Sequence, residues 1–118
     1  MKDQKENVIL KRTFEFALSI VEFAEVLDEN RKWVISKQLL KSGTSVGANV
    51  REAQGAESRN DFIHKLKIAY KEAEETEYWL DICTHARSYP DPGKLMDELI
   101  VIKKILTSII ATMKNKAA

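Results

Sequence analysis

Apolar residues along the 118-residue chain recur at alternating spacings of four and three, the repeat of helices that turn one face to a core. The third quarter of the chain follows this repeat at Phe62, Leu66, Ala69, Ala73, Thr76, Leu80 and Cys83. The last quarter follows it at Leu95, Leu99, Ile102, Leu106, Ile109 and Met113. Each set predicts one amphipathic helix with a single core-facing stripe.

The N-terminal helix, expected from about residue 5 to residue 28, carries two apolar stripes. The first stripe comprises Leu10, Phe14, Ala17, Val21 and Ala24. The second stripe comprises Ile9, Phe16, Ile20, Phe23 and Leu27. A helix that is apolar on two sides needs two partners, because monomers rarely expose a contiguous apolar patch of that size. We expect the first stripe to face the helix's own bundle. The second should form an oligomer interface, together with Trp79.

The second helix is expected to begin near Trp33 or Val34 and to end at Gly55, since glycine readily adopts the left-handed conformation that often ends a helix. Its inward positions are expected to be Ile35, Leu39, Val46 and Val50. Ser58 can then cap the third helix, and Asp61 three residues later nearly completes a capping box.

The third helix should end near Arg87, and Asp91 can cap a fourth helix that has Pro92 at its first position. Four helices of about 18–25 residues, joined by short turns, pack antiparallel. The sequence therefore predicts one all-α domain over residues 1–118, an antiparallel up-down-up-down four-helix bundle.

Composition agrees with a globular helical domain and excludes several classes of protein. Apolar residues make up 44% and charged residues 31%, and the net charge of +1 provides no bulk positive field for nucleic acid. The single cysteine, Cys83, excludes an internal disulfide and a Cys-rich zinc site. Because there is no signal-peptide pattern and no apolar run near ~18 residues, we expect a cytoplasmic protein without a membrane span.

Gly43 and Gly47 lie one helical turn apart in the expected second helix. The segment GTSVG lacks the Gly-Lys-Ser/Thr ending of a phosphate loop. Glycine within a helix costs about 1 kcal/mol relative to alanine. We therefore expect these glycines to permit close approach of a neighbouring helix.

Asn49, Glu74 and Glu77 are polar residues at the edges of the predicted core-facing stripes. A buried amide or carboxylate needs a hydrogen-bond partner, so we expect contacts between helices that fix their register. The alternative, an acid–base pair, lacks a nucleophile or a nearby histidine.

A di-iron centre is the natural enzymatic hypothesis for a four-helix bundle, and it requires two Glu-x-x-His pairs and two further glutamates. The chain offers only Asp61 and His64 at a related spacing, and its other histidine is His85. We therefore expect no metal, no cofactor and no enzymatic activity.

Lys37, Lys41 and Arg51 share the outer face of the expected second helix. Three exposed cations can be an ordinary solvated surface. In a ring of subunits they would instead be repeated into a basic belt that binds the phosphates of RNA or DNA.

The segments SGTSVGANVREAQGAES and DFIHKLKIAYKEAEETEYWL resemble the signature of a bacterial four-helix-bundle family. That family was first described as proteins encoded within 23S rRNA intervening sequences, and is also called the S23-type ribosomal protein family. The resemblance implies a closed bundle without enzymatic activity, ring-shaped homopentamers, and structural roles for Gly47, Asn49 and Glu77. A related, strongly basic branch serves diversity-generating retroelements and binds nucleic acid and a reverse transcriptase, whereas this chain is nearly neutral.

We therefore expect a non-catalytic, oligomeric scaffold or binding module, with RNA as the favoured ligand. The alternative is a protein–protein adaptor that binds no nucleic acid.

Overall fold

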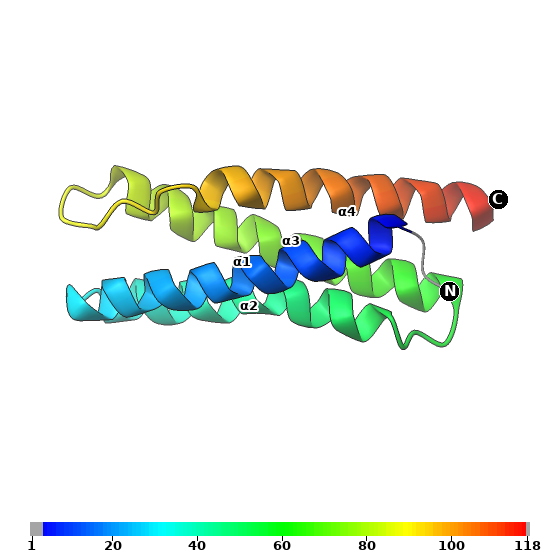
Figure 1. The fold of residues 1–118 in the computed structure, drawn as a ribbon, viewed down its shortest axis with the longest axis horizontal. Coiled ribbons are helices and arrows are strands. Elements are labelled where there is room, and N and C mark those ends of the chain that lie inside the picture. The colour runs from blue at the N-terminus through cyan, green and yellow to red at the C-terminus, as the bar shows by residue number, and fades with distance from the viewer. Residues whose placement is uncertain (1–3, 118) are drawn as a thin grey trace.

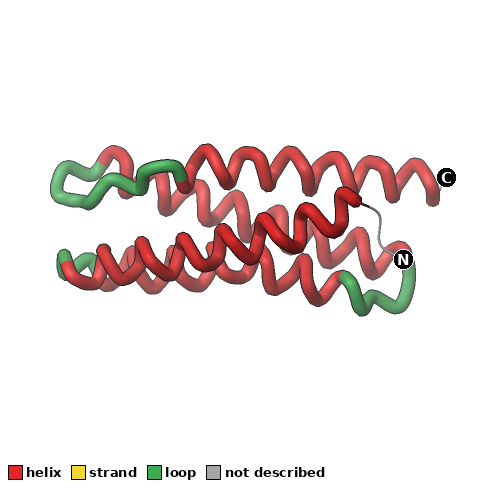
Figure 2. The backbone as a smooth tube through the Cα atoms, in the orientation of Figure 1, coloured by secondary structure: helices red, strands yellow, loops and turns green. Residues whose placement is uncertain are grey.

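The computed structural model describes the backbone of residues 4–117 and the side chains of residues 7–116. It contains α1 (Gln4–Glu29), α2 (Trp33–Ala53), α3 (Arg59–His85) and α4 (Leu95–Ala117). The helices run along the long axis of a body of 49 × 21 × 20 Å, and short turns connect them at its two ends (Figures 1 and 2). No strand occurs within residues 4–117. The prediction of an all-α up-down-up-down bundle is confirmed.

The bundle is closed, because each helix packs against the next one in the chain and α1 also packs against α4. The buried apolar residues of α2, α3 and α4 include Leu39, Val46, Val50, Phe62, Leu66, Ala69, Ala73, Leu80, Cys83, Leu95, Leu99, Ile102, Leu106 and Ile109. These are positions that the four–three spacing predicts. Ile35 and Met113, which were also predicted, are partly buried at the edge of the core.

The two apolar stripes of α1 lie largely on the opposite sides to those predicted, although Ala24 of the stripe expected inside is buried as predicted. The stripe expected on the outside, Ile9, Phe16, Ile20, Phe23 and Leu27, is buried in the core with exposed fractions of 0% to 8%. In the stripe expected inside, Phe14 is 50% exposed and Val21 is 40% exposed. The outward assignment of the second stripe, which begins at Ile9, is therefore wrong, and its buried members offer little surface to another subunit. The physical reason is that this set holds the larger side chains, so turning it inward removes more apolar area from water.

Two glycines of α2 set the closest approach of α1 to α2. A Cβ atom added at Gly43 would lie 2.8 Å from Cγ1 of Ile20. One added at Gly47 would lie 3.1 Å from the carbonyl oxygen of Thr13. Both distances are shorter than the roughly 3.5–4.0 Å of a comfortable carbon contact, so the two helices lie as close as they do because these positions carry no side chain.

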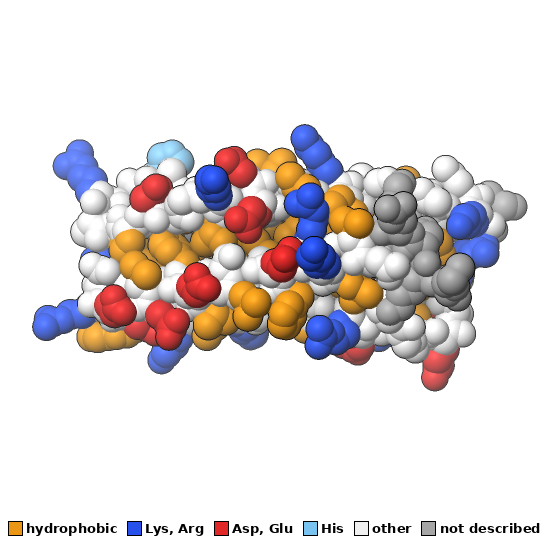
Figure 3. All heavy atoms as spheres, viewed as in Figure 1, with side chains coloured by type: hydrophobic (Ala, Val, Ile, Leu, Met, Phe, Trp, Pro, Cys, Tyr) orange, Lys and Arg blue, Asp and Glu red, His pale blue; other side chains and the backbone are white. Residues whose placement is uncertain are grey.

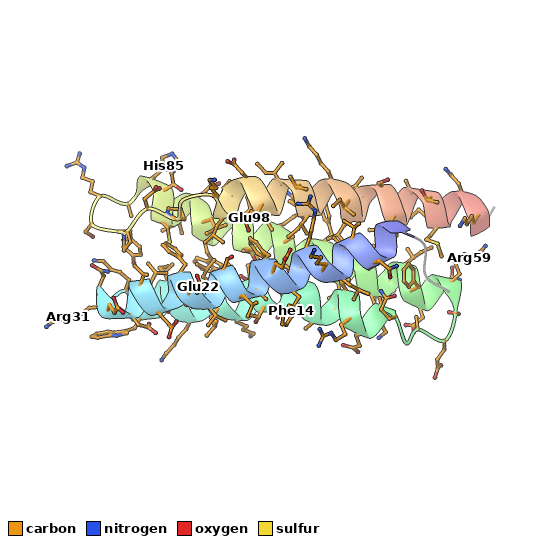
Figure 4. All side chains as sticks on the ribbon, viewed as in Figure 1. Phe14, Glu22, Arg31, Arg59, His85 and Glu98 are labelled. Atoms are coloured by element: carbon orange, nitrogen blue, oxygen red, sulfur yellow. The ribbon has the colours of Figure 1, made fainter. Side chains whose placement is uncertain are left out.

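The turn between α1 and α2 is closed by backbone hydrogen bonds. Arg31 has a φ of 62°, and its N–H donates to the carbonyl oxygen of Asp28 at 3.0 Å. The N–H of Lys32 donates to the carbonyl oxygen of Leu27 at 2.8 Å. This pair of bonds is a Schellman motif, in which the left-handed residue is an arginine where glycine is usual. Figure 4 shows Arg31 projecting from this end of the molecule.

Two predicted helix ends differ from the structure. Gly55 does not adopt a left-handed conformation, because α2 ends at Ala53 and unwinds through hydrogen bonds between residues three apart. Pro92 is not the first residue of α4, since Gly93 follows it with a φ of 64° and the helix begins at Leu95. The cap of α3 is as predicted: Ser58 Oγ accepts a hydrogen bond from the N–H of Asp61 at 3.0 Å.

Candidate binding surfaces

An exposed apolar strip runs along the outer side of α1 where it meets α2. We call it the α1–α2 strip, and its members are Leu10, Phe14, Ala17, Leu18 and Val21 of α1 with Leu40, Thr44 and Ala48 of α2. Phe14 and Leu18 are 50% and 49% exposed. Beside Gly47 the strip is hollowed into a groove of about 270 Å³. Apolar side chains gather along this edge in Figure 3, and Figure 4 shows Phe14 directed toward α2.

Arg51 belongs to this strip more than to a basic belt. Its guanidinium carbon lies 5.6 Å from the centre of the Phe14 ring. This is a cation–π contact, in which the electron-rich face of the ring attracts the positive charge. Lys37 and Lys41 are exposed one turn apart on α2. Ten residues, about 15 Å of helix, separate Lys41 from Arg51. The structure therefore does not bring the three predicted cations into one compact site.

Trp79, the predicted interface residue outside the N-terminal helix, lies on α3. It is half-buried against the core, and its Nε1–H donates to Oε2 of Glu75 at 3.3 Å. The ring of Tyr78, which is 59% exposed, meets it edge-on with centroids 5.2 Å apart. Trp79 is thus held by its own helix, and its predicted interface role remains a prediction.

The three residues predicted to make polar contacts between helices, Asn49, Glu74 and Glu77, differ in what they contact in the structure. Asn49 donates from Nδ2 to the carbonyl oxygen of Ser45 at 2.8 Å, which is a bond within α2. Glu74 is exposed. Glu77 does reach another helix, since its Oε1 accepts from Nζ of Lys103 on α4 at 2.7 Å. The predicted contact between helices is therefore present at Glu77, whereas Asn49, half-buried at the edge of the core, bonds within its own helix.

The buried polar pair between α2 and α3 consists of Ser42 and Thr76. Both residues are 0% exposed, and their hydroxyl oxygens lie 3.0 Å apart. Thr76 Oγ1 is also 2.7 Å from the carbonyl oxygen of Glu72. Thr76 was expected in the core stripe of α3, but the four–three spacing gives no sign that its hydroxyl meets one on α2. This pair makes the buried contact between helices that the sequence assigned to Asn49.

The two histidines and the cysteine are not gathered at one place in the described part of the chain. His64 and His85 are exposed near opposite ends of α3, 21 residues or about 30 Å apart, and His85 points away from the bundle in Figure 4. Burial raises the pKa of the Cys83 thiol to about 11. Among the described residues, no three His, Cys, Asp or Glu side chains are grouped as a metal ion would require.

A second surface, the α3–α4 groove, lies where these two helices run side by side (Figure 1). Two adjoining hollows of about 450 and 360 Å³ share Tyr70 and Thr107 and form one continuous groove. Its lysines are Lys67, Lys71, Lys103, Lys104 and Lys114, and its carboxylates are Glu74 and Glu77. Tyr70, Ile110 and Ala111 line the groove between these charges. The groove is therefore basic at its edges and apolar between them.

The lysines of the groove differ in whether a nearby carboxylate neutralises their charge. Burial acts to lower the pKa of Lys103, but the hydrogen bond and charge of Glu77 outweigh it and raise the pKa. Lys103 Nζ also lies 5.2 Å from the centre of the Tyr70 ring. At the other end, contact with the side chain of Lys114 lowers the pKa of Lys67. Among the described side chains, no carboxylate lies within ion-pair distance of Lys67, Lys71 or Lys114.

The sequence gives only a weak sign of this groove. Lys67 and Lys71 are one turn apart on α3, but Lys114 is 43 positions beyond Lys71 and comes from another helix. Only the side-by-side packing of α3 and α4 brings them to one surface.

The described residues also contain no helix with an apolar stretch long enough to cross a bilayer.

Comparison with known proteins places the chain in a family. The pattern of the 23S rRNA-intervening sequence proteins matches residues 5–108. A crystal structure, solved at 1.70 Å, of a protein of unknown function from the S23 ribosomal protein family of Bacteroides thetaiotaomicron VPI-5482 is 45% identical in sequence. The similarity covers 92% of this chain and 99% of that one, with a TM-score of 0.86. No curated protein sequence matches the chain. The chain therefore belongs to the family of 23S rRNA-intervening sequence proteins.

Proposed function

We propose that this protein is a non-catalytic binding module that assembles into a homo-oligomer through the α1–α2 strip and binds nucleic acid. The observation that carries the proposal is the exposure of Phe14, Leu18 and Val21 in one line on α1. A stripe of three half-exposed large apolar side chains beside a groove is typical of a protein interface.

The strip also has the shape that close subunit contact requires. Gly47, Thr44 and Ala48 are small, so another helix can approach the hollow between α1 and α2. Burying the exposed half of each large side chain contributes about 1 kcal/mol. The apolar surface that the strip meets on the other copy contributes burial energy as well. Together they offset an association cost at the lower end of the range of about 4–15 kcal/mol.

Head-to-tail contact between the strip and a different surface of the next copy would close into a ring. The resemblance to ring-forming relatives favours a pentamer. Trp79 and its exposed neighbour Tyr78 supply one candidate surface for the receiving side. A cytoplasmic location fits a protein that meets RNA in a bacterial cell.

The lysine-edged α3–α4 groove supports nucleic acid as the ligand class. The alternative, a protein–protein adaptor, would use the α1–α2 strip for an unrelated protein instead of another copy. The two functions differ in the mass of the purified protein, because an adaptor would be a monomer of 13.5 kDa.

Light scattering on the purified protein tests the assembly. We expect several times the chain mass at tens of micromolar, and a lower mass for the Phe14→Glu, Val21→Glu double variant with its helical content unchanged. A matched control is Ile100→Glu with Val101→Glu, since these residues are 40% and 38% exposed on α4. A wild-type protein that stays monomeric would contradict self-assembly, and an equal drop in mass for both variants would contradict the α1–α2 strip as the interface.

A further inference from the structure

We propose that the α3–α4 groove binds single-stranded nucleic acid, with phosphates at its lysine edges and bases against its apolar centre. This inference rests on the proposed function. It specifies which surface of the protein binds nucleic acid and that the nucleic acid is single-stranded. It also moves the site away from Lys37, Lys41 and Arg51, the cations that the sequence favoured.

The charge of the groove selects an anionic ligand. Lys67, Lys71 and Lys114 surround one end of it, where Glu74 is the only lining carboxylate among the described residues. Lys67 and Lys114 are close enough for Lys114 to lower the pKa of Lys67. Two neighbouring ammonium groups repel each other until an anion lies between them, so a bridging phosphate relieves a cost already present in the free protein.

The length of the groove selects a chain rather than a single anion. Lys104 and Lys114 mark its two ends on α4, ten residues or about 15 Å apart. Tyr70 and Thr107 line both hollows, so the groove is continuous between these lysines. Successive phosphates of one strand can therefore meet successive lysines.

The apolar centre of the groove selects single strands over duplexes. Tyr70, Ile110 and Ala111 lie between the lysines, where an aromatic base can pack but a phosphate gains nothing. Bases are exposed in single strands and stacked inside duplexes. An acidic peptide would satisfy the lysines, but it carries no flat ring for each charge to place against Tyr70.

The location of the groove is compatible with the proposed assembly. The helices pack in the cyclic order α1, α2, α3, α4, so the outer side of the α3–α4 pair is opposite the outer side of the α1–α2 pair. The α1–α2 strip of a copy therefore lies away from its own groove, and on the receiving copy Tyr78 lies seven residues, about 10 Å, along α3 from Lys71. A ring would repeat the groove once per subunit and lengthen the strand it can hold.

The test measures binding of a fluorescent 20-nucleotide oligo-U RNA to the full-length protein and to two charge-matched variants. One variant is Lys67→Gln with Lys114→Gln in the groove, and the other is Lys37→Gln with Lys41→Gln on α2. We expect the groove variant to lose about tenfold or more in affinity at 50 mM salt and to flatten the salt dependence by about 1.4 in log–log slope. The α2 variant should bind like wild type, and Lys67→Arg with Lys114→Arg should retain binding.

Several outcomes would overturn the inference. If wild type binds no RNA even at low salt, the nucleic-acid part of the proposed function fails with it. If wild type binds but the groove variant loses no more than the α2 variant, the groove assignment alone fails. Equal binding of a duplex, or of polyglutamate, would contradict the single-stranded nucleic-acid ligand. A changed oligomer mass in the groove variant would instead place these lysines at a subunit contact.

Discussion

A methyl group on Gly43 would lie 2.8 Å from Cγ1 of Ile20, a residue that is itself fully buried in the core. We therefore expect Gly43→Ala to destabilise the bundle by about 1–3 kcal/mol, although alanine favours a helix by about 1 kcal/mol over glycine. Urea unfolding measures the change. Ile20→Ala removes the three atoms that the methyl group would meet, so the double variant should lose less stability than the sum of the two single variants. Additive losses would show that Ile20 does not limit position 43.

Phe14 and Phe16 are two residues apart on α1, but they are 50% and 1% exposed. Phe16→Ala should cost about 3–5 kcal/mol of unfolding free energy because it empties a core site. Phe14→Ala should cost less than about 1 kcal/mol per chain when measured under conditions that keep the chain monomeric. Chemical denaturation at low protein concentration compares the two. A larger loss for Phe14→Ala would restore the stripe order that the sequence predicted.

Phe14 and Phe16 show which features of the fold the sequence predicts and which it does not. The four–three spacing identifies both stripes of α1, and it places the core of α3 and α4 correctly at Leu66, Leu80, Leu99 and Leu106. It does not say which stripe of α1 faces inward, because that depends on where α2 and α4 lie in space. Side-chain size was the available signal, since the buried stripe contains two phenylalanines.

The candidate sites were harder to predict for the same reason. Lys67 and Lys114 meet only because α3 and α4 pack side by side. Likewise, Ser42 and Thr76 are small polar residues whose pairing depends on the axial register of α2 against α3. Spacing within one helix carries no information on either relationship. Among the local signals, Ser58 predicts the cap of α3 correctly, whereas Gly55 and Pro92 do not mark the helix ends that the structure has.

The Ser42–Thr76 contact predicts a measurable coupling. Thr76→Val removes one hydroxyl and leaves Ser42 Oγ with a single acceptor, the carbonyl oxygen of Leu39 at 3.5 Å. We expect a loss of about 1–3 kcal/mol, and a loss in the Ser42→Ala, Thr76→Val double variant that is smaller than the sum of the single losses. Thr107→Val is the control, because Thr107 is exposed and its hydroxyl donates to the carbonyl oxygen of Lys103 in its own helix. Additivity would contradict a hydrogen bond between the two hydroxyl groups.

Cys83 should be unreactive toward thiol reagents in the folded protein. Burial raises its pKa from 9.0 to about 11, and the reactive species is the thiolate. At pH 8 the thiolate fraction is therefore about 100-fold lower than in the unfolded chain, before steric protection is counted. Between pH 9 and pH 11 the unfolded chain releases this proton while the folded chain retains it. The free energy of unfolding therefore falls as pH rises. Equal labelling rates at pH 8 with and without urea would contradict this environment.

The central claim is that the α1–α2 strip is covered by another copy of the chain. Labelling rates of an introduced thiol test it most directly: Leu18→Cys replaces a residue that is 49% exposed in the strip, and Val101→Cys replaces one that is 38% exposed on α4. The native Cys83 adds little background because it is buried. At tens of micromolar, we expect the thiol at position 18 to react at least about tenfold more slowly than the thiol at position 101, and to become faster on dilution. Equal rates at every protein concentration would contradict the account, because the strip would then be open to solvent.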